Sequence, residues 1–317
     1  MYQVFEKCFS SEVVLIIGVL FTFLLTFIML ALRPSFLPKD QGRAFAVNGE
    51  LSKGKLRGVG LIFTLTFLVG CGLFMPVERV WETVVFGVLV ILIMLSGYLD
   101  DASEKPWNEY KKGLIDLVLA VATMVLYVYC YGSTIMIFGS EMTLPAWLYC
   151  LLGVILIWVS INVTNCTDGV DGLLGSVSSV TILSYVLLFG GALSEFCYAA
   201  CYLLAALCAY LFFNTSPSSM LMGDAGSRAI GYFIALLALK SGHPLLWLLL
   251  GIVMILDGGL GLLKISLKRF LKICILKNTR TPLHDHCRKN KGWSDTQVVV
   301  RFTLLQVLAC VIAMLLL

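Results

Sequence analysis

Residues 13–32 read VVLIIGVLFTFLLTFIMLAL, an uncharged and almost entirely apolar run. A helix that crosses a bilayer needs about 20 such residues, because the hydrocarbon core is about 30 Å thick and each residue rises about 1.5 Å. The run follows an acidic start and lacks the basic n-region and small-residue cleavage site of a signal peptide. We therefore expect a retained membrane-spanning helix.

The remainder of the chain has the same character. Its 317 residues are 59% hydrophobic and 13% charged, whereas soluble domains carry roughly 25% charged residues. Backbone groups in lipid must be satisfied internally, which leaves helices for segments this apolar. The apolar segments lie at about 12–32, 59–76, 82–99, 114–131, 146–162, 172–190, 196–213, 228–240, 244–264 and 297–317. The sequence predicts an all-α, polytopic integral membrane protein with about ten transmembrane helices, in which residues 1–317 form a single transmembrane domain.

The ninth apolar segment carries Asp257-Gly258-Gly259 in its interior. A glycine pair beside a carboxylate is unfavourable in a straight apolar helix. We therefore expect this segment to be bent or broken.

The basic residues predict the orientation. Loops 33–58, 100–113, 162–171, 214–227 and 265–296, with their edges, hold 20 of the 23 Lys and Arg residues. Lys7, Arg79 and Lys240 fall on the other side. The positive-inside rule makes those loops cytoplasmic, so the N and C termini are both expected outside. The net charge of +4 then reflects one basic face that suits anionic lipid and phosphate-bearing substrates, and no nucleic-acid partner is expected.

Four polar clusters interrupt the apolar pattern, and each falls in a loop already assigned to the cytoplasm. They are Gly97-Tyr98-Leu99-Asp100-Asp101, the run NVTNCTDGVDG at 162–172, Asn214 with MGDAGS at 222–227, and PLHDH at 282–286. The basic residues and the clusters are nearly independent observations. Their agreement predicts that the chemistry of the protein lies on the cytoplasmic face.

Carboxylates near a bilayer are costly unless they are paired, solvated or bound to a cation. The clusters supply five of them: Asp100, Asp101, Asp168, Asp171 and Asp224. Such oxygen ligands suit Mg²⁺, which uses one or two carboxylates plus substrate phosphates. Asp168 and Asp171 would share one face if they open the sixth helix.

The clusters also contain groups that suit a phosphate. Their glycines allow close approach of the backbone to a phosphate, and Lys111, Lys112 and Arg228 supply counter-charge. Together with the carboxylates, these features indicate phosphoryl transfer.

Each cluster, taken alone, is also compatible with a purely structural role or with a different activity. The Asp100-Asp101 pair fits a solvated helix end, and TDGVDG and MGDAGS fit capped glycine turns. The two histidines with Cys287 are compatible with zinc, although the chain offers few further ligands. A transporter would place charges near the midplane in repeated halves, but no repeat is visible and only Asp257 lies well inside a span, apart from Asp116 near the start of the fourth.

The order DD, NxxNxTDGxDG, FN…MGDxGS and PLHxH on ten spans resembles the phospho-N-acetylmuramoyl-pentapeptide transferases (translocase I, MraY). These belong to the polyprenyl-phosphate N-acetylhexosamine-1-phosphate transferase superfamily. The resemblance covers about residues 50–317, and the tail PLHDHCRKNKGWSDTQVVVRF at 282–302 favours the muramoyl-pentapeptide branch.

The resemblance implies transfer of phospho-MurNAc-pentapeptide from UDP-MurNAc-pentapeptide to undecaprenyl phosphate, giving lipid I and UMP in peptidoglycan synthesis. The implied enzyme is a Mg²⁺-dependent phosphoglycosyl transferase and a homodimer, placed in the bacterial cytoplasmic (inner) membrane with its active site facing the cytoplasm. The alternative is a sibling enzyme that uses UDP-GlcNAc or another UDP-N-acetylhexosamine.

The resemblance also implies roles for residues. Asp224 matches the Mg²⁺ ligand, and Asp100, with Asp101 beside it, matches a carboxylate proposed to deprotonate the lipid phosphate. Asp168 and Asp171 match acidic residues around the pyrophosphate and nucleotide, and His284 a histidine near the sugar-nucleotide. The implied substrate contacts are Lys53, Lys111, Asn162, Asn165, Asn214 and His286.

Three departures concern the nucleotide side. Asp285 replaces the middle one of three histidines, the segment 53–60 lacks the family's Thr-Pro-Thr, and Lys264 stands where a glutamine is expected.

Two reaction routes are compatible with the sequence. Direct attack by the prenyl phosphate is favoured because its second pKa, near ~6, leaves it largely ionised. A two-step route would use a nucleophile such as Asp168.

Overall fold

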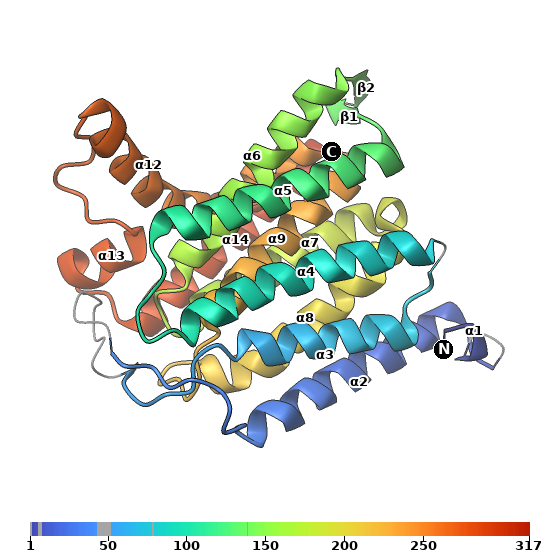
Figure 1. Cartoon of the computed structure of the whole chain (residues 1–317), viewed down its shortest axis with the longest axis horizontal. Helices are drawn as coiled ribbons and strands as arrows, with labels where there is room; N and C mark the ends of the chain where they lie inside the picture. The colour runs from blue at the N-terminus through green and yellow to red at the C-terminus, as the bar shows by residue number, and fades with distance from the viewer. Residues whose placement is uncertain (1, 6–7, 43–51, 78, 138) are drawn as a thin grey trace.

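In the computed structural model, which describes residues 2–5, 8–42, 52–77, 79–137 and 139–317, the helices run back and forth between two ends of one bundle (Figure 1). The long helices are α2 (Ser11–Ala31), α3 (Gly60–Phe74), α4 (Val80–Asp101), α5 (Glu109–Tyr131), α6 (Ala146–Thr167), α7 (Leu173–Leu193), α8 (Glu195–Asn214), α9 (Gly223–Lys240) and α14 (Asp295–Leu316). The short helix α1 (Tyr2–Phe5) precedes them, and α13 (Leu283–Lys291) precedes α14. Arg43 and the rest of 43–51 in the first predicted loop, and Lys7, lie outside the described residues.

Seven helices in the described part of the chain are long and apolar enough to cross a membrane, and a bent pair makes an eighth if it is one span. The prediction of an all-α, polytopic membrane protein is therefore confirmed. All ten predicted segments coincide with helical segments, but α3 has only 15 residues and α9 carries Asp224, Arg228 and Lys240. The count of ten spans and the outward termini stay predictions.

A short hairpin is the one β-sheet within the described residues, and composition did not suggest it. Strand β1 (Thr134–Ile137) pairs antiparallel with β2 (Ser140–Thr143), with Thr134 opposite Thr143. The hairpin joins α5 to α6 at the end of the bundle where both termini lie (Figure 1).

The ninth predicted segment is bent, as expected. It consists of η2 (Pro244–Leu246), α10 (Trp247–Leu250), α11 (Ile252–Met254), the π-helical η3 (Ile255–Gly259), α12 (Leu260–Ser266) and the π-helical η4 (Leu267–Leu271). The 68° bend falls at Gly251, while Asp257 and its two glycines form the π-helical turn. Beyond the bend, α12 projects away from the bundle (Figure 1).

Helix α9 is the centre of the bundle, and its side chains from Gly223 to Leu239 are all buried. It packs against α4 and α6 through glycines. A Cβ atom on Gly97 of α4 would lie 2.3 Å from the Asp224 carbonyl oxygen, and one on Gly60 of α3 would lie 2.0 Å from the Gly226 nitrogen. Small residues at helix contacts let backbones approach closely in membranes. The glycines therefore fix the start of α9 against its neighbours.

The four polar clusters gather at one end of this bundle. The ends of α4, α6 and α8 and the starts of α5, α7 and α9 meet on the left of Figure 1, opposite both termini. The sequence analysis predicted this gathering. It placed the four clusters in alternate loops, and alternate loops of a helical bundle lie at the same end.

Gly97→Ala is expected to destabilise the protein by about 1–3 kcal/mol, because the added methyl group overlaps backbone atoms of α9. Gly87→Ala on the same helix is the matched control, since a Cβ there meets no atom within 4 Å. Thermal unfolding of the purified protein in detergent measures both variants. Equal melting temperatures for the two would show that the α4–α9 approach does not limit stability.

Candidate active site

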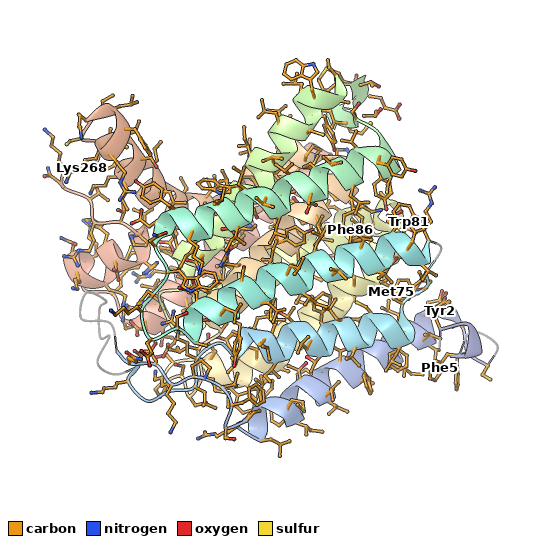
Figure 2. All side chains as sticks on the ribbon, in the orientation of Figure 1. Tyr2, Phe5, Met75, Trp81, Phe86 and Lys268 are labelled. Atoms are coloured by element: carbon orange, nitrogen blue, oxygen red, sulfur yellow. The ribbon has the colours of Figure 1, made fainter. Side chains whose placement is uncertain are left out.

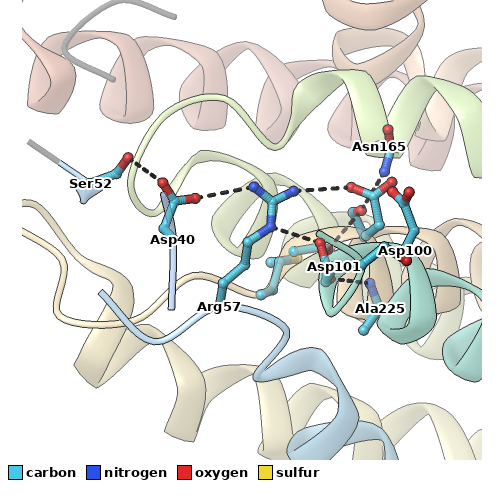
Figure 3. Close-up of polar contacts among 12 residues, drawn as sticks. Asp40, Ser52, Arg57, Asp100, Asp101, Asn165 and Ala225 are labelled. Atoms are coloured by element: carbon cyan, nitrogen blue, oxygen red, sulfur yellow. Dashed lines mark hydrogen bonds and ion pairs between the residues drawn. The ribbon is translucent and has the colours of Figure 1, made fainter. Parts of the chain in front are cut away.

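Arg57 lies at the centre of a group of carboxylates from three separate segments (Figure 3). Its Nε is 2.7 Å from Asp101 Oδ1, its Nη1 is 3.1 Å from Asp40 Oδ2, and its Nη2 is 3.5 Å from Asp224 Oδ1. Asp101 is the last residue of α4 and Asp224 the second of α9, so Arg57 joins the loop before α3 to both helices. Asp101 also accepts the Ala225 backbone N–H at 3.1 Å.

The electrostatics of this group favour the charged forms outside the helices. Burial acts to raise the pKa of Asp40, but the Gly42 amide, the Ser52 hydroxyl and the Arg57 charge together hold it below its ordinary value. Burial acts to lower the pKa of Arg57, but the neighbouring carboxylates Asp101, Asp224 and Asp40 outweigh burial and raise it. Arg57 therefore stays a cation at any physiological pH.

Lys112 holds the other side of Asp224. Its Nζ is 2.9 Å from Asp224 Oδ2 and also contacts Asp100 Oδ2. The second oxygen of Asp100 accepts the Trp107 backbone N–H at 2.6 Å. Asp224, with 5% of its surface exposed, thus has a cation on each side.

A further ion pair joins α5 and α9 one helical turn further into the bundle. Asp116 of α5 contacts Arg228 Nη2 of α9, and both side chains are buried. Asp116 follows Lys112 by four residues and Arg228 follows Asp224 by four, so the two helices face each other through two ion pairs of opposite direction. Nε and Nη1 of Arg228 have no hydrogen-bond partner within the described structure. An isolated buried charge is strongly unfavourable, so Asp116 neutralises Arg228.

The end of α6 contacts the same helix start, and the turn between α6 and α7 contacts the end of α8. Asn165 Nδ2 donates to Ser227 Oγ at 3.0 Å, and Asn214 Oδ1 accepts the Gly172 N–H at 2.9 Å. Gly172 has φ +85°, a conformation that glycine adopts without strain. These bonds join the second and third predicted clusters.

Asp168 and Asp171 lie in this turn, because α7 begins only at Leu173. They therefore do not share the face of a sixth helix, which corrects the expectation based on their spacing. Asp171 Oδ2 accepts the Ser218 N–H at 2.9 Å and is 3.4 Å from Lys55 Nζ. Asp168 follows the last residue of α6 and is half-buried.

His284 is oriented by Asp257, which the sequence analysis did not assign to the site. The Asp257 carboxylate accepts the His284 backbone N–H at 2.7 Å and lies 2.8 Å from its Nδ1. If Nδ1 carries the proton, Nε2 is an acceptor. A Cβ on Gly169 would lie 2.3 Å from that Nε2, so the ring abuts the TDGVDG turn.

His286 and Asp285 flank this ring. Nδ1 of His286 accepts the Arg280 N–H at 3.3 Å. Asp285 Oδ1 is 3.9 Å from His284 Nε2 and 3.8 Å from Arg288 Nη1. Asp285 thus balances an arginine beside the histidine, and a middle histidine would not supply that negative charge.

Three residues assigned to substrate lie outside this hydrogen-bonded network. Lys111 Nζ sits 3.3 Å above the Trp107 ring, and Asn162 Nδ2 donates to the Trp158 carbonyl at 2.8 Å. Lys53 is exposed. Lys112, one position along, reaches the carboxylates instead.

Several residues of the site were not singled out from the sequence. Arg57 and Lys55 were counted only as basic residues of a cytoplasmic loop, and Asp40 was not considered. A signal for the two basic residues was present in the sequence. Clustered carboxylates that are buried need cations beside them, and Lys55 and Arg57 are basic residues of a loop on the same side. Asp257 was noted as a carboxylate inside a span but was not assigned to the site, although such residues are commonly functional.

The carboxylate oxygens are donors of the kind that Mg²⁺ prefers. Among the described residues, no group of three or more His, Cys, Asp or Glu side chains is arranged to hold a metal ion. Mg²⁺ needs only one or two protein carboxylates when substrate phosphates complete its shell. The residues around Asp224 fit this second mode.

Comparisons with known proteins identify the family of this chain. The model of glycosyl transferase family 4 matches residues 83–242, from α4 to just beyond α9. A phospho-N-acetylmuramoyl-pentapeptide-transferase of Treponema pallidum (strain Nichols) is 40% identical over 86% of this chain and 80% of its own length. Proteins of the same name from Dictyoglomus turgidum and Limosilactobacillus reuteri are each 26% identical, over 85% and 94% of this chain and 87% and 96% of their own lengths. The chain therefore belongs to glycosyl transferase family 4 and, within it, to the phospho-N-acetylmuramoyl-pentapeptide transferases, and it is a phosphoglycosyl transferase.

Proposed function

We propose that this protein transfers phospho-MurNAc-pentapeptide from UDP-MurNAc-pentapeptide to undecaprenyl phosphate, giving lipid I and UMP. The proposal places the reaction at the cytoplasmic face of the bacterial inner membrane, with Mg²⁺. Family membership makes the protein a phosphoglycosyl transferase of peptidoglycan synthesis, and the names of its relatives support this substrate. The observation that carries the proposal is the convergence of all four polar clusters at one end of the bundle.

The cluster around Asp224 suits a reaction between two phosphates. Arg57 and Lys112 each bridge Asp224 to a second carboxylate, so both cations are already held at the site. Incoming phosphates attract these cations, and the carboxylates then require another positive charge. Mg²⁺ supplies that charge at Asp224 and neutralises the pyrophosphate when bound.

The proposed reaction is one direct displacement. An oxygen of the lipid phosphate forms a bond to the sugar-linked phosphorus, the bond to the UMP oxygen breaks, and its electron pair leaves with UMP. Asp100 acts as base or electrostatic organiser next to Lys112, since the lipid phosphate is already largely ionised. A covalent sugar-phosphate adduct trapped on Asp168 or another aspartate would replace this route with two steps.

On the nucleotide side, His284 offers a hydrogen-bonding group held in one orientation. Asp257 binds both its backbone and its ring, and the ring abuts Gly169. A preorganised side chain loses little entropy when it binds a substrate. We assign His284 to the sugar-nucleotide, together with Asp168 and Asp171 of the neighbouring turn and Asn165 at the end of α6.

A UMP-release assay tests this function. Purified protein with undecaprenyl phosphate and Mg²⁺ is expected to release UMP from UDP-MurNAc-pentapeptide but not from UDP-GlcNAc. Asp224→Asn should lower turnover by about 10²–10³-fold, the usual loss when one electrostatic contact to the transition state is removed. Glu104→Gln, an exposed carboxylate in the same loop region, is the control. Turnover of UDP-GlcNAc alone would assign the protein to the sibling reaction, and no turnover of either would contradict the proposal.

The two adjacent lysines are expected to behave differently. Lys112→Met should lower kcat by about 100-fold, because it removes the cation between Asp100 and Asp224. Lys111→Met removes an exposed contact with Trp107 worth about 0.5–1 kcal/mol and should leave kcat within a few-fold. Steady-state kinetics on both variants decides the assignment. A larger loss of kcat for Lys111→Met than for Lys112→Met would instead support the sequence-based assignment of Lys111 as a substrate contact.

A further inference from the structure

A second charged site lies at the opposite end of the bundle. A pocket of about 260 Å³ is formed where α4 and α8 begin and α5 and α9 end. Arg79, Glu82, Tyr131, Glu195 and Lys240 contribute its polar lining. Figure 2 shows Trp81 and Met75 at this end and Lys268 at the other. The pocket is therefore separate from the carboxylate cluster.

Glu82 and Glu195 are buried in this pocket, whereas Arg79 is exposed. Glu82 is 1% exposed, and its Oε1 has no hydrogen-bond partner among the described residues. Lys240 Nζ lies 3.9 Å from that oxygen and 3.6 Å above the Tyr131 ring, and Arg79 Nη1 lies 3.8 Å from Oε2. A buried acceptor without a donor is costly. Glu82 Oε1 is therefore available to a donor from a ligand.

An apolar groove of about 820 Å³ runs beside this pocket between α3 and α4. On α4 it extends from Val80 to Ile91, about 16 Å of helix rise. That length matches one leaflet, half of a hydrocarbon core about 30 Å thick. Val80 and Val84 are 65% and 56% exposed, so the groove opens toward lipid.

The pocket and the groove share the first turn of α4. Thr83 lines the groove, and its hydroxyl donates to Glu195 Oε1 of the pocket at 3.5 Å. Arg79, at the start of the same helix, keeps 58% of its side chain exposed. A molecule with a polar head and an acyl chain can occupy both spaces around this turn.

We propose that this end of the bundle binds one phospholipid whose headgroup carries a primary ammonium and a phosphodiester. Its acyl chain lies in the groove, its phosphate contacts Arg79 and Lys240, and its ammonium donates to Glu82 and Glu195. Two cations and two carboxylates give the pocket no formal net charge, which matches a zwitterion. A quaternary ammonium has no N–H to donate to Glu82, and a glycerol headgroup has no cation. The lipid belongs to the leaflet opposite the carboxylate cluster.

Native mass spectrometry of the delipidated full-length protein tests the proposal with an equimolar mixture of phosphatidylethanolamine, phosphatidylcholine and phosphatidylglycerol. The wild-type protein is expected to retain one phosphatidylethanolamine in preference to the others by about tenfold, the scale of one charge-assisted hydrogen bond. Equal retention of the three lipids, or none, would overturn the proposal. This assay does not depend on the transferase reaction.

Two variants separate the headgroup from the chain. Glu82→Gln should abolish the preference for the primary ammonium but keep lipid bound. Gly87→Leu should reduce retention of all three lipids, because Gly87 faces the groove and its Cβ position is open. Val121→Phe, an exposed apolar position on α5 outside the groove, is the control for an enlarged surface.

Each variant is first compared with wild type by thermal unfolding, and Gly72→Leu on the facing wall replaces Gly87→Leu if that variant is unstable. Unchanged retention with a filled groove, or an unchanged preference in Glu82→Gln, would contradict the assigned site.

Discussion

The neutralisation of Asp224 by two cations is the interaction on which the rest of this structure depends. Asp224 sits 5% exposed near the start of a fully buried helix, where an unpaired carboxylate would be strongly unfavourable. Arg57 belongs to the loop before α3, and Lys112 lies at the start of α5. Because these partners are distant in sequence, the loop and both helices must be in place together. The pairing of Asp224 is therefore complete only in the assembled bundle.

The glycine contacts are the apolar counterpart of this pairing. Gly97 and Gly60 bring α4 and α3 so close to α9 that a single methyl group would overlap its backbone. Such contact leaves no room for water between the helices, which strengthens every ion pair at the edge of the contact. Close packing and charge pairing thus support each other at the same few residues.

The sequence predicted the class of fold and the gathering of the four polar clusters at one end of the bundle, because both follow from patterns spread over many residues. Apolar length alone located every long helix, and the order of loops placed the four clusters together. The contacts of individual side chains were predicted less well from the sequence. Lys111 and Lys112 differ by about 100° around α5, and only the packing of that helix decides which one meets Asp224. Arg57 gave no signal of its own because two of its three partners, Asp101 and Asp224, come from distant segments.

The paired ions between α5 and α9 have a mechanical consequence. The helices run in the same direction, with Lys112 beside Asp224 and Asp116 beside Arg228 one turn further on. If α5 slid by one turn either way, Lys112 would meet Arg228 or Asp116 would meet Asp224, and like charges would oppose each other. The two ion pairs thus fix the position of α5 along α9, because only the observed register places opposite charges together at both turns.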